Sequence, residues 1–440
     1  FVRSTPWEVI EAESGLSRHA LERAAMTYAT AQRTVAVYGM GLTQHKHGVS
    51  SIQMLVNLLL LKGNIGRRGA GICPVRGHSN VQGQRTVGIS EKPELVPLDR
   101  LEELYGFKAP REEGMTTVDV CQGIIDRKVA AFVGLGGNFI RAVPERSLME
   151  EAWPGMRLTV QVATKLNRSH LFNGEVAFLL PCLGRIEIDK QATGPQIVTM
   201  EDSTACFHSS RGYATPASPF LRSEPAIVAG IAKATLQPNP NVPWDAWVAD
   251  YSKVRDAIEQ TWPEIFREFN KRMDEPGGFP KPLAARERIW ETESGKANFK
   301  LPKAMSASFH DGKDPRILRL MTLRSNDQFN TTIYGYRDRF RGIEGTRMVV
   351  MMNADDMLHL GIVDGDIVEL KTAVDDGVER RMSGFRAVEY NIPPGCCAAY
   401  YPECNVLIPL WQHAEESKVP AAKSIPVRVL IDEKQRHAAE

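Results

Sequence analysis

Apolar residues follow helical and strand periods in turn over the first 75 positions of the chain. Between residues 21 and 28 they recur at helical spacing, and Ser17 precedes them as a plausible N-cap. The apolar run 34–38 predicts a short buried strand. The run 52–62 predicts a second helix, which ends at Gly63. The pattern therefore predicts an α–β–α arrangement.

The same alternation returns further along the chain. A continuous apolar strand is expected over 129–133, and it ends in the glycine-rich run 134–138. A helix over 144–153 follows, and then strands over 158–162 and 175–180. Apolar strands that alternate with helices are typical of parallel sheets with helices on both faces. The predicted fold class is α/β with doubly wound parallel-sheet domains.

The last third of the sequence has a different pattern of closely spaced short strands, which predicts a small β-barrel. These strands are expected over 317–323, 348–352, 367–371, 380–388, 397–401 and 425–430. Residues 236–314 are rich in proline and predict a connecting segment with one helix over 243–274. Little regular structure is expected over 276–282. The predicted domains are 1–76, 77–235, 236–314 and 315–440.

Composition narrows the classes of function. Lys and Arg number 54 against 53 Asp and Glu, so no net field points to nucleic acid. The longest apolar run, near 55–61, is far shorter than a membrane span of about 20 residues. Seven cysteines show no C-x-x-C pair, so no iron–sulfur cluster is expected on this chain. We expect a cytoplasmic protein without a membrane span.

Glycine-rich segments carry the main chemical signal. Residues 62–88 contain seven glycines with interleaved arginines, which lets backbone amides approach an anionic ligand closely. The segment is not a P-loop, and a flexible surface loop is the alternative interpretation. The runs 38–45 and 134–138 place glycines at the ends of predicted parallel strands, where α/β sheets bind ligands. Two such strand ends indicate a large ligand with two ends.

These segments resemble the molybdopterin oxidoreductases that carry two molybdopterin guanine dinucleotides, and formate dehydrogenases in particular. The resemblance rests on Met40-Gly41-x-Thr43-Gln44, on the glycines of 61–71, and on Pro74-Val75-Arg76-Gly77-x-x-Asn80-Val81-Gln82-Gly83. It continues through Thr164-Lys165 into the segment 322–332 and Asn405. It implies two α/β domains and a C-terminal double-psi β-barrel around the paired cofactor.

The resemblance also implies which residues contact the cofactor, molybdenum or tungsten bis(molybdopterin guanine dinucleotide). Gln44 is similar to the family's contact to one pterin nucleotide. The strand ends that hold a guanosine diphosphate in the family correspond to Gly137, Asn138, Gln161 and Thr164. The barrel segments along the pterins correspond to Arg324, Gln328, Asn330, Thr331 and Asn405. For each barrel residue alone, a purely structural role is an equal alternative.

Arg76 is the expected catalytic residue, with an ordinary salt bridge to a phosphate or carboxylate as the alternative. In formate dehydrogenases the arginine of this block faces the metal, and a guanidinium offers two parallel donors to a carboxylate. His78 stands where formate dehydrogenases commonly have Gln, so its contact to the cofactor would differ. His45 is another possible contact to the cofactor, with a core or surface role as the alternative.

The resemblance implies a two-electron oxidation of formate or a similar small anion. Electrons would pass through a [4Fe–4S] cluster to an acceptor protein or cofactor. The family's cluster and metal ligands precede the segments that match here, so both are expected on a missing N-terminal part. An oxygen-atom-transfer reductase acting on a substrate such as nitrate is one alternative. A catalytically silent cofactor-binding fragment is another.

Overall fold

The computed structural model describes residues 2–304 and 314–432. Its first elements form a small α/β unit with the parallel strand pair β1–β2. Ser17 caps α2, because its hydroxyl accepts a hydrogen bond from the Ala20 amide. Val35 and Val37 of β1 are exposed, so the prediction of a buried strand is wrong. The elements are α1 (Trp7–Ser14), α2 (Arg18–Thr30), β1 (Val35–Tyr38), α3 (Met40–Thr43), α4 (Gly48–Leu61) and β2 (Gly71–Pro74).

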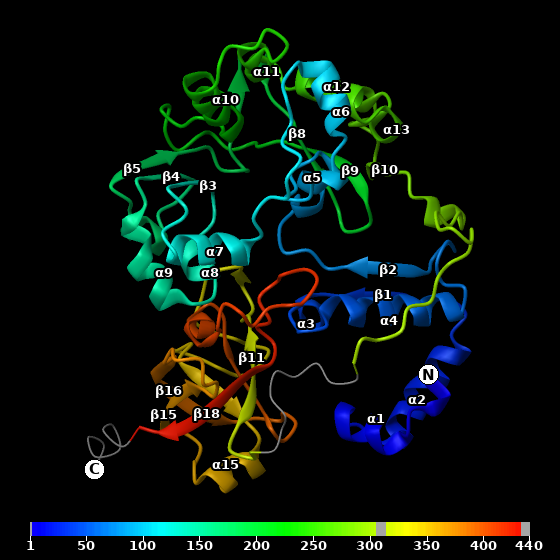
Figure 1. Cartoon of the computed structure of the whole chain (residues 1–440), viewed down its shortest axis with the longest axis vertical. Helices are drawn as coiled ribbons and strands as arrows, with labels where there is room; N and C mark the ends of the chain where they lie inside the picture. Colours follow the sequence, from blue (N-terminus) through cyan, green and yellow to red (C-terminus); the bar gives the residue numbers. More distant parts are fainter. Residues whose placement is uncertain (1, 305–313, 433–440) are drawn as a thin grey trace.

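The second unit is built on the parallel sheet β3–β4–β5 (Figure 1). β4 is almost wholly buried, and Trp153 is fully buried among the apolar residues of α7, α8 and α9. On β3, Val133 and Leu135 are exposed, so only one face of that strand is covered by the described residues. The elements are α5 (Val81–Thr86), α6 (Leu98–Tyr105), α7 (Thr117–Ile125), β3 (Ala131–Leu135), α8 (Phe139–Ala142), α9 (Arg146–Ala152), β4 (Leu158–Ala163) and β5 (Val176–Pro181).

A third group of elements joins two small antiparallel sheets, one of three strands and one of two, to a cluster of helices. The strands are β6 (Lys190–Gln191), β7 (Gly194–Pro195), β8 (Val198–Glu201), β9 (Cys206–Ser210) and β10 (Phe279–Pro280), and the helices are α10 (Glu224–Thr235), α11 (Trp244–Ala249), α12 (Ser252–Thr261), α13 (Pro263–Phe266) and α14 (Phe269–Arg272).

One prediction about this connecting region is wrong. The single helix expected over 243–274 is four helices, because Pro263 cannot continue α12 and Glu268 has a left-handed backbone with φ 54°. Little regular structure is present over 276–282, as predicted, although Phe279 is fully buried and the two-residue strand β10 pairs with β9. Residues 305–313 of the predicted connecting segment lie outside the described residues.

The C-terminal region is a closed barrel of six strands in the order β11–β17–β14–β16–β15–β18. Its interior is filled by apolar side chains such as Leu320, Val350, Leu370 and Phe385, which are fully buried. The predicted β-barrel is thus confirmed, although residues 433–440 lie outside the described residues. The strands are β11 (Leu318–Leu323), β14 (Val349–Met352), β15 (Ile367–Thr372), β16 (Arg381–Glu389), β17 (Cys396–Tyr400) and β18 (Ile425–Ile431); α15 (Ala354–Leu360) and the hairpin β12 (Gln328–Phe329)–β13 (Thr332–Ile333) accompany them.

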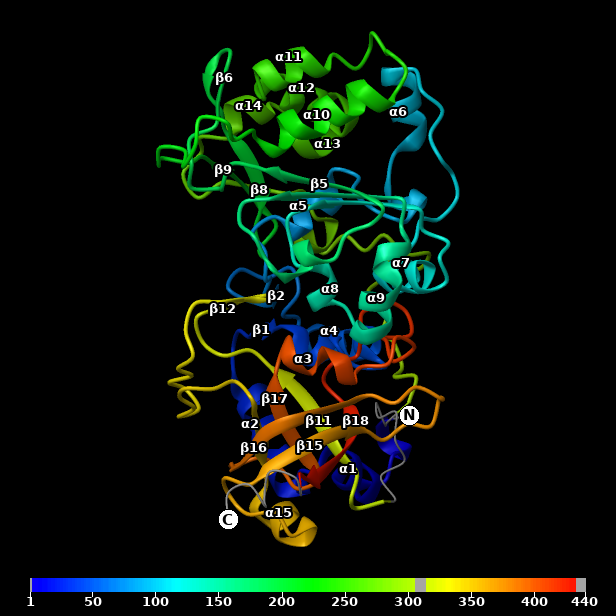
Figure 2. The ribbon, with the colours of Figure 1, turned by 90° about the vertical axis from the view of Figure 1, so that its left-hand side faces the viewer.

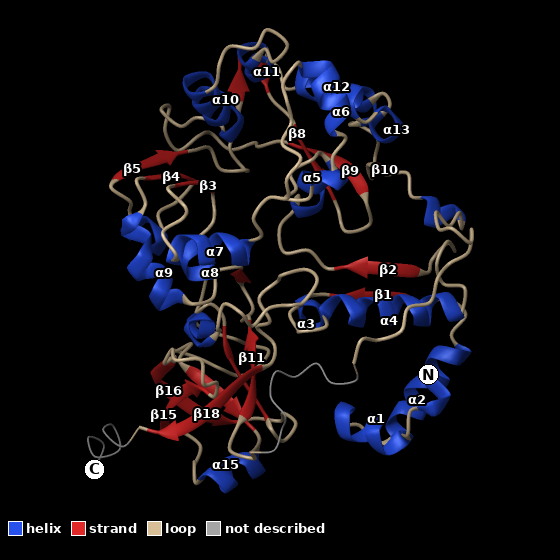
Figure 3. Ribbon diagram, viewed as in Figure 1, coloured by secondary structure: helices blue, strands red, loops and turns tan. Residues whose placement is uncertain are grey.

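The units are stacked along the long axis of the molecule, with the barrel at one end and α10–α14 at the other (Figures 2 and 3). A buried ion pair links the barrel to the β3–β4–β5 unit. Arg380 donates to both carboxylate oxygens of Glu145 at 2.7 and 2.9 Å. In the part of the chain that the structure describes, no helix has the length and apolar character needed to cross a membrane.

Candidate functional site

A cavity of about 720 Å³ lies where α3, α8, the barrel strand β11 and the loop before β18 meet. Its volume falls in the range of about 300–1,000 Å³ that is usual for ligand sites. Four predicted site residues, Gln44, Arg324, Asn330 and Asn405, line it together. The other polar residues of the lining are Arg85, Glu91, Thr116, Thr117, Thr322, Tyr401, Ser417, Lys418 and Lys423.

Arg324 follows β11 and is held over the ring of Tyr401, with the guanidinium carbon 4.9 Å from the ring centroid. The Asn330 side-chain oxygen accepts from the Tyr401 hydroxyl at 2.7 Å and from Arg324 at 3.4 Å. Burial raises the pKa of Tyr401, so its hydroxyl keeps its proton and remains a donor. The three side chains form a connected polar wall beside the cavity.

Lys423 lies in the loop before β18 and lines the same cavity as Arg324. Its ammonium donates to the Thr322 carbonyl, and its backbone amide donates to the Gln44 carbonyl at 3.2 Å. Burial, with Arg324 and Arg341 nearby, lowers the pKa of Lys423 to about 8. A cation whose neighbours disfavour its charge is suited to receive an anion.

Most of the positive side chains that line the cavity are not paired with acidic side chains. Arg85 pairs with Glu91 at 2.6 Å. Within residues 2–304 and 314–432, Arg324, Lys418 and Lys423 form no ion pair with a carboxylate. The cavity therefore has three positive side chains available to an anionic ligand.

Gln44 and Asn405 contribute amides from two different units. Gln44 ends α3, and Asn405 lies in the 3-10 helix Glu403–Leu407, where it is 1% exposed and donates to the Arg141 carbonyl at 2.8 Å. His45 is bonded to the Gly41 carbonyl at 2.8 Å, and burial is the main cause of its lowered pKa. The His45 ring is therefore occupied within its own turn and tends to be neutral.

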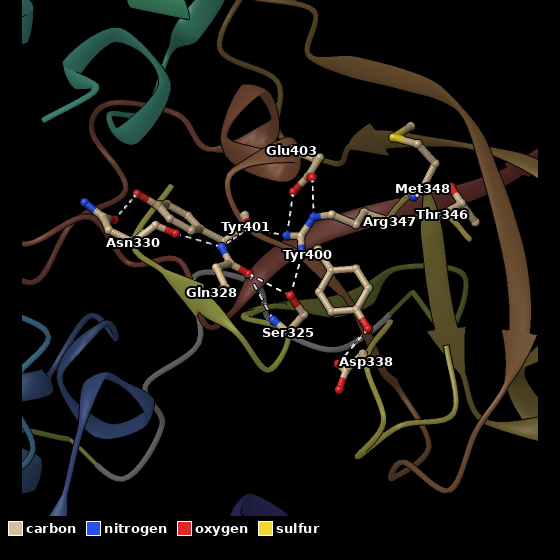
Figure 4. A network of polar contacts seen from close by, with 10 residues as sticks. All are labelled: Ser325, Gln328, Asn330, Asp338, Thr346, Arg347, Met348, Tyr400, Tyr401 and Glu403. Carbon is tan, nitrogen blue, oxygen red and sulfur yellow. Dashed lines mark hydrogen bonds and ion pairs between the residues drawn. The ribbon is translucent and has the colours of Figure 1, made fainter. Parts of the chain in front are cut away.

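Gln328 is engaged by the protein itself (Figure 4). Its amide nitrogen donates to the carbonyls of Asn330 and Tyr401, and its oxygen accepts from the Ser325 amide. Arg347 completes this network with bonds to Glu403, Ser325 and the Tyr401 carbonyl. Gln328 thus fixes the shape of the segment that presents Asn330.

The end of β3 meets the barrel directly. Asn138 donates to the Thr331 hydroxyl at 3.2 Å and accepts from Ser169 at 2.6 Å. Gln161 is buried, and its amide lies 3.4 Å from the Ser169 carbonyl. Gly137 has φ 83° and open space where a Cβ would point. This strand end leaves room for a ligand at Gly137 while Asn138 connects the two units.

Thr164 belongs to a different cavity. It lines a smaller space of about 260 Å³ together with polar and charged residues such as Arg185, Glu187 and Asp189. Five of the predicted cofactor contacts therefore line two separate cavities. Gln44, Arg324, Asn330 and Asn405 line the large one, and Thr164 lines the small one.

Arg76 and His78 are exposed residues of the segment between β2 and α5, and neither is part of the lining of the large cavity. The Arg76 guanidinium donates to the Gln82 side-chain oxygen. Gln82 in turn donates to the buried Glu201 at 2.5 Å. Arg76, the predicted catalytic residue, is thus held by Gln82 on α5, and Gln82 is held in turn by Glu201 on β8.

Comparison with known proteins agrees with this arrangement. Residues 318–426, which contain almost the whole barrel, match the molydopterin dinucleotide binding domain. A stretch of 138 residues is 30% identical to the F420-dependent formate dehydrogenase subunit alpha of Methanocaldococcus jannaschii, covering 31% of this chain and 20% of that protein. The barrel is therefore a molydopterin dinucleotide binding domain, and the chain is similar to oxidoreductases, including one formate dehydrogenase subunit.

Longer matches extend over nearly all of this chain. It is 46% identical to Protein YdeP of Escherichia coli over 430 residues, which is 97% of the chain and 56% of YdeP. It is 44% identical to an uncharacterized oxidoreductase of Mycobacterium tuberculosis over 421 residues, 94% of the chain and 53% of that protein. The chain thus spans about half the length of these relatives. Acetylene hydratase from Pelobacter acetylenicus aligns with a TM-score of 0.46 at 14% identity, over 87% of this chain and 54% of that one.

The residues of the large cavity fit the cofactor that defines molybdopterin oxidoreductases. A dinucleotide has phosphates and polar rings, and the cavity offers cations for the former and amides for the latter. No cluster of His, Cys, Asp or Glu able to hold a metal ion occurs among the described residues. The fit is to the organic part of the cofactor.

Sequence reasoning missed the positively charged residues that line the large cavity. Lys423 is the only charged residue between Lys418 and Arg428, and a lone lysine in an apolar run is a signal for a functional charge. Tyr401 directly precedes Pro402 but carries no motif of its own. Both residues come next to Gln44 or Arg324 only through the folding of the barrel.

Proposed function

We propose that this chain holds molybdenum or tungsten bis(molybdopterin guanine dinucleotide) in a redox enzyme that oxidises formate or a similar small anion. The observation that carries the proposal is the convergence of Arg324, Lys418 and Lys423 with three amide side chains on one cavity. Cations without acidic partners suit the phosphates of a dinucleotide. The metal, when bound through the cofactor, would supply the two-electron chemistry.

Each group of residues has its own part in this proposal. Arg324, Lys418 and Lys423 bind phosphate, while Gln44, Asn330 and Asn405 bind polar ring atoms. Gly137, Asn138, Gln161, Thr164 and Thr331 accept the second dinucleotide at the end of the β3–β4–β5 sheet, with Gln328 and His78 shaping the neighbouring segments. Arg76 orients the anionic substrate through its two parallel donors.

The proposal includes partners outside this chain. Electrons leave through a [4Fe–4S] cluster on the remaining part of the full-length protein and reach an acceptor protein or cofactor. Relatives roughly twice as long as the matched region leave room for such a part.

The test uses the full-length protein produced with its cofactor. Molybdenum, tungsten and guanine nucleotide are measured per chain, and reduction of a viologen dye is followed with formate. We expect about two guanine nucleotides per metal and formate-dependent dye reduction. Cofactor with nitrate-dependent oxidation of reduced dye, and no formate activity, would instead identify an oxygen-atom-transfer reductase. A chain without pterin would overturn the proposal.

Variants connect the measurement to the cavity. Arg324→Met and Lys423→Met remove phosphate-binding charges, so each should lower guanine nucleotide per chain several-fold. Lys371→Met is the matched control, because Lys371 pairs with Glu379 on the exposed side of the barrel. Equal nucleotide content in all three variants would remove the cavity from the proposal.

A further inference from the structure

Glu201 is a buried acid that no part of the proposed chemistry uses. It ends β8, its side chain is fully buried, and it lies about 120 positions along the chain from the glycine-rich block that it contacts. Its carboxylate accepts from Gln82 at 2.5 Å and from the Thr86 hydroxyl at 2.5 Å. A buried carboxylate is costly unless its oxygens are satisfied, and both are satisfied by α5.

The surroundings of Glu201 are built for close approach. The Asn80 side-chain oxygen accepts from the Glu201 amide at 3.0 Å. A Cβ on Gly83 would lie 2.1 Å from that oxygen and 3.2 Å from the Glu201 nitrogen, so only glycine allows α5 to lie this close to β8. Lys281 adds a positive charge 4.0 Å from the carboxylate and donates to Thr86 at 3.0 Å.

The chemistry of Gln82 gives this arrangement a direction. A carboxylate only accepts and a guanidinium only donates. Gln82 must therefore present its NH₂ group to Glu201 and its carbonyl oxygen to Arg76, as the structure has it. An amide between two charged groups of fixed polarity has one orientation, and each bond polarises the other.

We propose that Glu201 is the positioning residue for Arg76 and acts through the side chain of Gln82. The inference rests on the proposed function, in which Arg76 orients the anionic substrate. Glu201 would fix the orientation of the Gln82 amide and hence the place of the guanidinium. Because a glutamine at position 201 can also donate, Glu201→Gln removes the constraint from this side and leaves the Arg76 guanidinium alone to orient the Gln82 amide.

Two variants separate positioning from simple attachment of α5. Glu201→Gln disturbs the polarity of the Gln82 bond, whereas Thr86→Val keeps that bond and removes the second bond to the carboxylate together with the bond from Lys281, with nearly unchanged shape. In the loaded full-length enzyme, we expect Glu201→Gln to lower kcat per metal about 10- to 100-fold, as for a misplaced substrate-orienting group. Thr86→Val should change it less than about threefold, and metal content should stay normal in both. Glu369→Gln, which loses a single Ser383 contact on the barrel, is the control for an amide substitution.

A double-mutant cycle tests whether the effect passes through Arg76. In an Arg76→Ala background, Glu201→Gln should have no further effect on kcat. An equal fold-loss in both backgrounds would overturn the proposal, as would Thr86→Val matching Glu201→Gln.

Amide hydrogen exchange over residues 75–88 gives a readout that does not depend on activity. Glu201→Gln should speed exchange around Arg76 and Gln82 more than Thr86→Val does, and unchanged exchange would overturn the relay. If Arg76→Ala alone leaves turnover normal while this exchange pattern holds, the catalytic role of Arg76 fails and the hydrogen-bonded relay stands.

Discussion

Lys423 determines how the charge of the large cavity responds to pH. In the folded chain the pKa of Lys423 is about 8, below the ordinary value of 10.5. Below pH 8, the charge on Lys423 therefore lowers the free energy of unfolding. As pH rises from about 8 towards 10.5 this penalty disappears, because only the unfolded chain is then still protonated. A bound phosphate would do the opposite and favour the charged form.

Binding of guanosine diphosphate to the chain should therefore weaken with pH. From pH 7 to pH 9 we expect a loss of about tenfold in affinity, since the protonated fraction of a group with a pKa near 8 falls by about that factor. Guanidinium groups in general do not titrate in this range, and the lowered pKa of His45 places its titration below this window. Calorimetric titration at three pH values measures the effect, and Lys423→Met should bind weakly with no slope. A slope that persists in Lys423→Met would assign the titration to another group.

Arg76 has a separate prediction in the full-length loaded enzyme. Arg76→Ala should lower turnover per metal by on the order of 10²–10³, as for loss of a positioned charged donor, and Arg76→Lys by less. Metal content should remain near normal, because the cavity residues are unchanged. If metal and pterin fall together while turnover per metal is normal, Arg76 has a structural role instead.

Single residues differed in how well the sequence could predict them. Gln44, Arg324, Asn330 and Asn405 carry family motifs, and the structure brings them to one cavity. Lys423 could not be placed there from sequence, because its position depends on a backbone bond between its loop and Gln44. Gln328 shows the reverse, since its motif is clear but its amide is used within the protein.

At the scale of elements, the glycine-rich block has both fixed and free positions. Gly66 has φ 67°, and a Cβ there would lie 2.5 Å from the Arg288 side chain and 2.9 Å from the Ala285 carbonyl. Arg288 in turn donates to the carbonyls of Gly63 and Ile65. The first half of the block is therefore packed against the segment Ala284–Glu287, which excludes a loose surface loop there.

Gly66→Ala should lower the free energy of unfolding by about 1–3 kcal/mol, because it combines a left-handed backbone with a backbone clash. Gly77→Ala in the same block should change it by less than about 0.5 kcal/mol, since its Cβ would meet no atom within 4 Å. Urea denaturation of both variants measures the difference. Similar losses at the two positions would mean that the block is packed along its whole length.

The elements themselves were predictable where the signal is local. The six barrel strands begin and end within about two residues of the expected ranges, because turns and short apolar runs mark each one. The helix over 243–274 failed at Pro263 and Glu268, where local backbone constraints overrode the periodicity. The burial of β1 failed because periodicity cannot show which neighbours cover a strand.

At the scale of the whole molecule, the Arg380–Glu145 pair connects the barrel to the β3–β4–β5 unit. Glu145 also accepts from the Leu410 amide at 2.9 Å, and Arg380 bonds Asp376 at 2.9 Å. Both partners are less than 10% exposed, so loss of Arg380 leaves Glu145 buried without a counter-charge, whereas loss of Glu145 leaves Arg380 with Asp376. Which distant segments form such a pair was not predictable from local pattern.

Arg380→Met should cost about 3–5 kcal/mol of unfolding free energy, the usual effect of breaking a buried pair. Glu145→Gln should cost less, because Arg380 keeps Asp376 as a counter-charge. Lys371→Met breaks an exposed pair with Glu379 and should cost no more than about 1 kcal/mol. Chemical denaturation followed by tryptophan fluorescence gives the three values. Equal values for Arg380→Met and Lys371→Met would show that the two units do not depend on this contact.

The closure of the barrel by β18 has a consequence for biosynthesis. β18 pairs with both β11 and β15, and Lys423 immediately precedes it. A ribosome must therefore pass Ile425 before the cavity lined by Arg324 and Lys423 can be complete. Under the proposed function, a nascent chain stalled before Ile425 would lack the finished cavity that binds the cofactor.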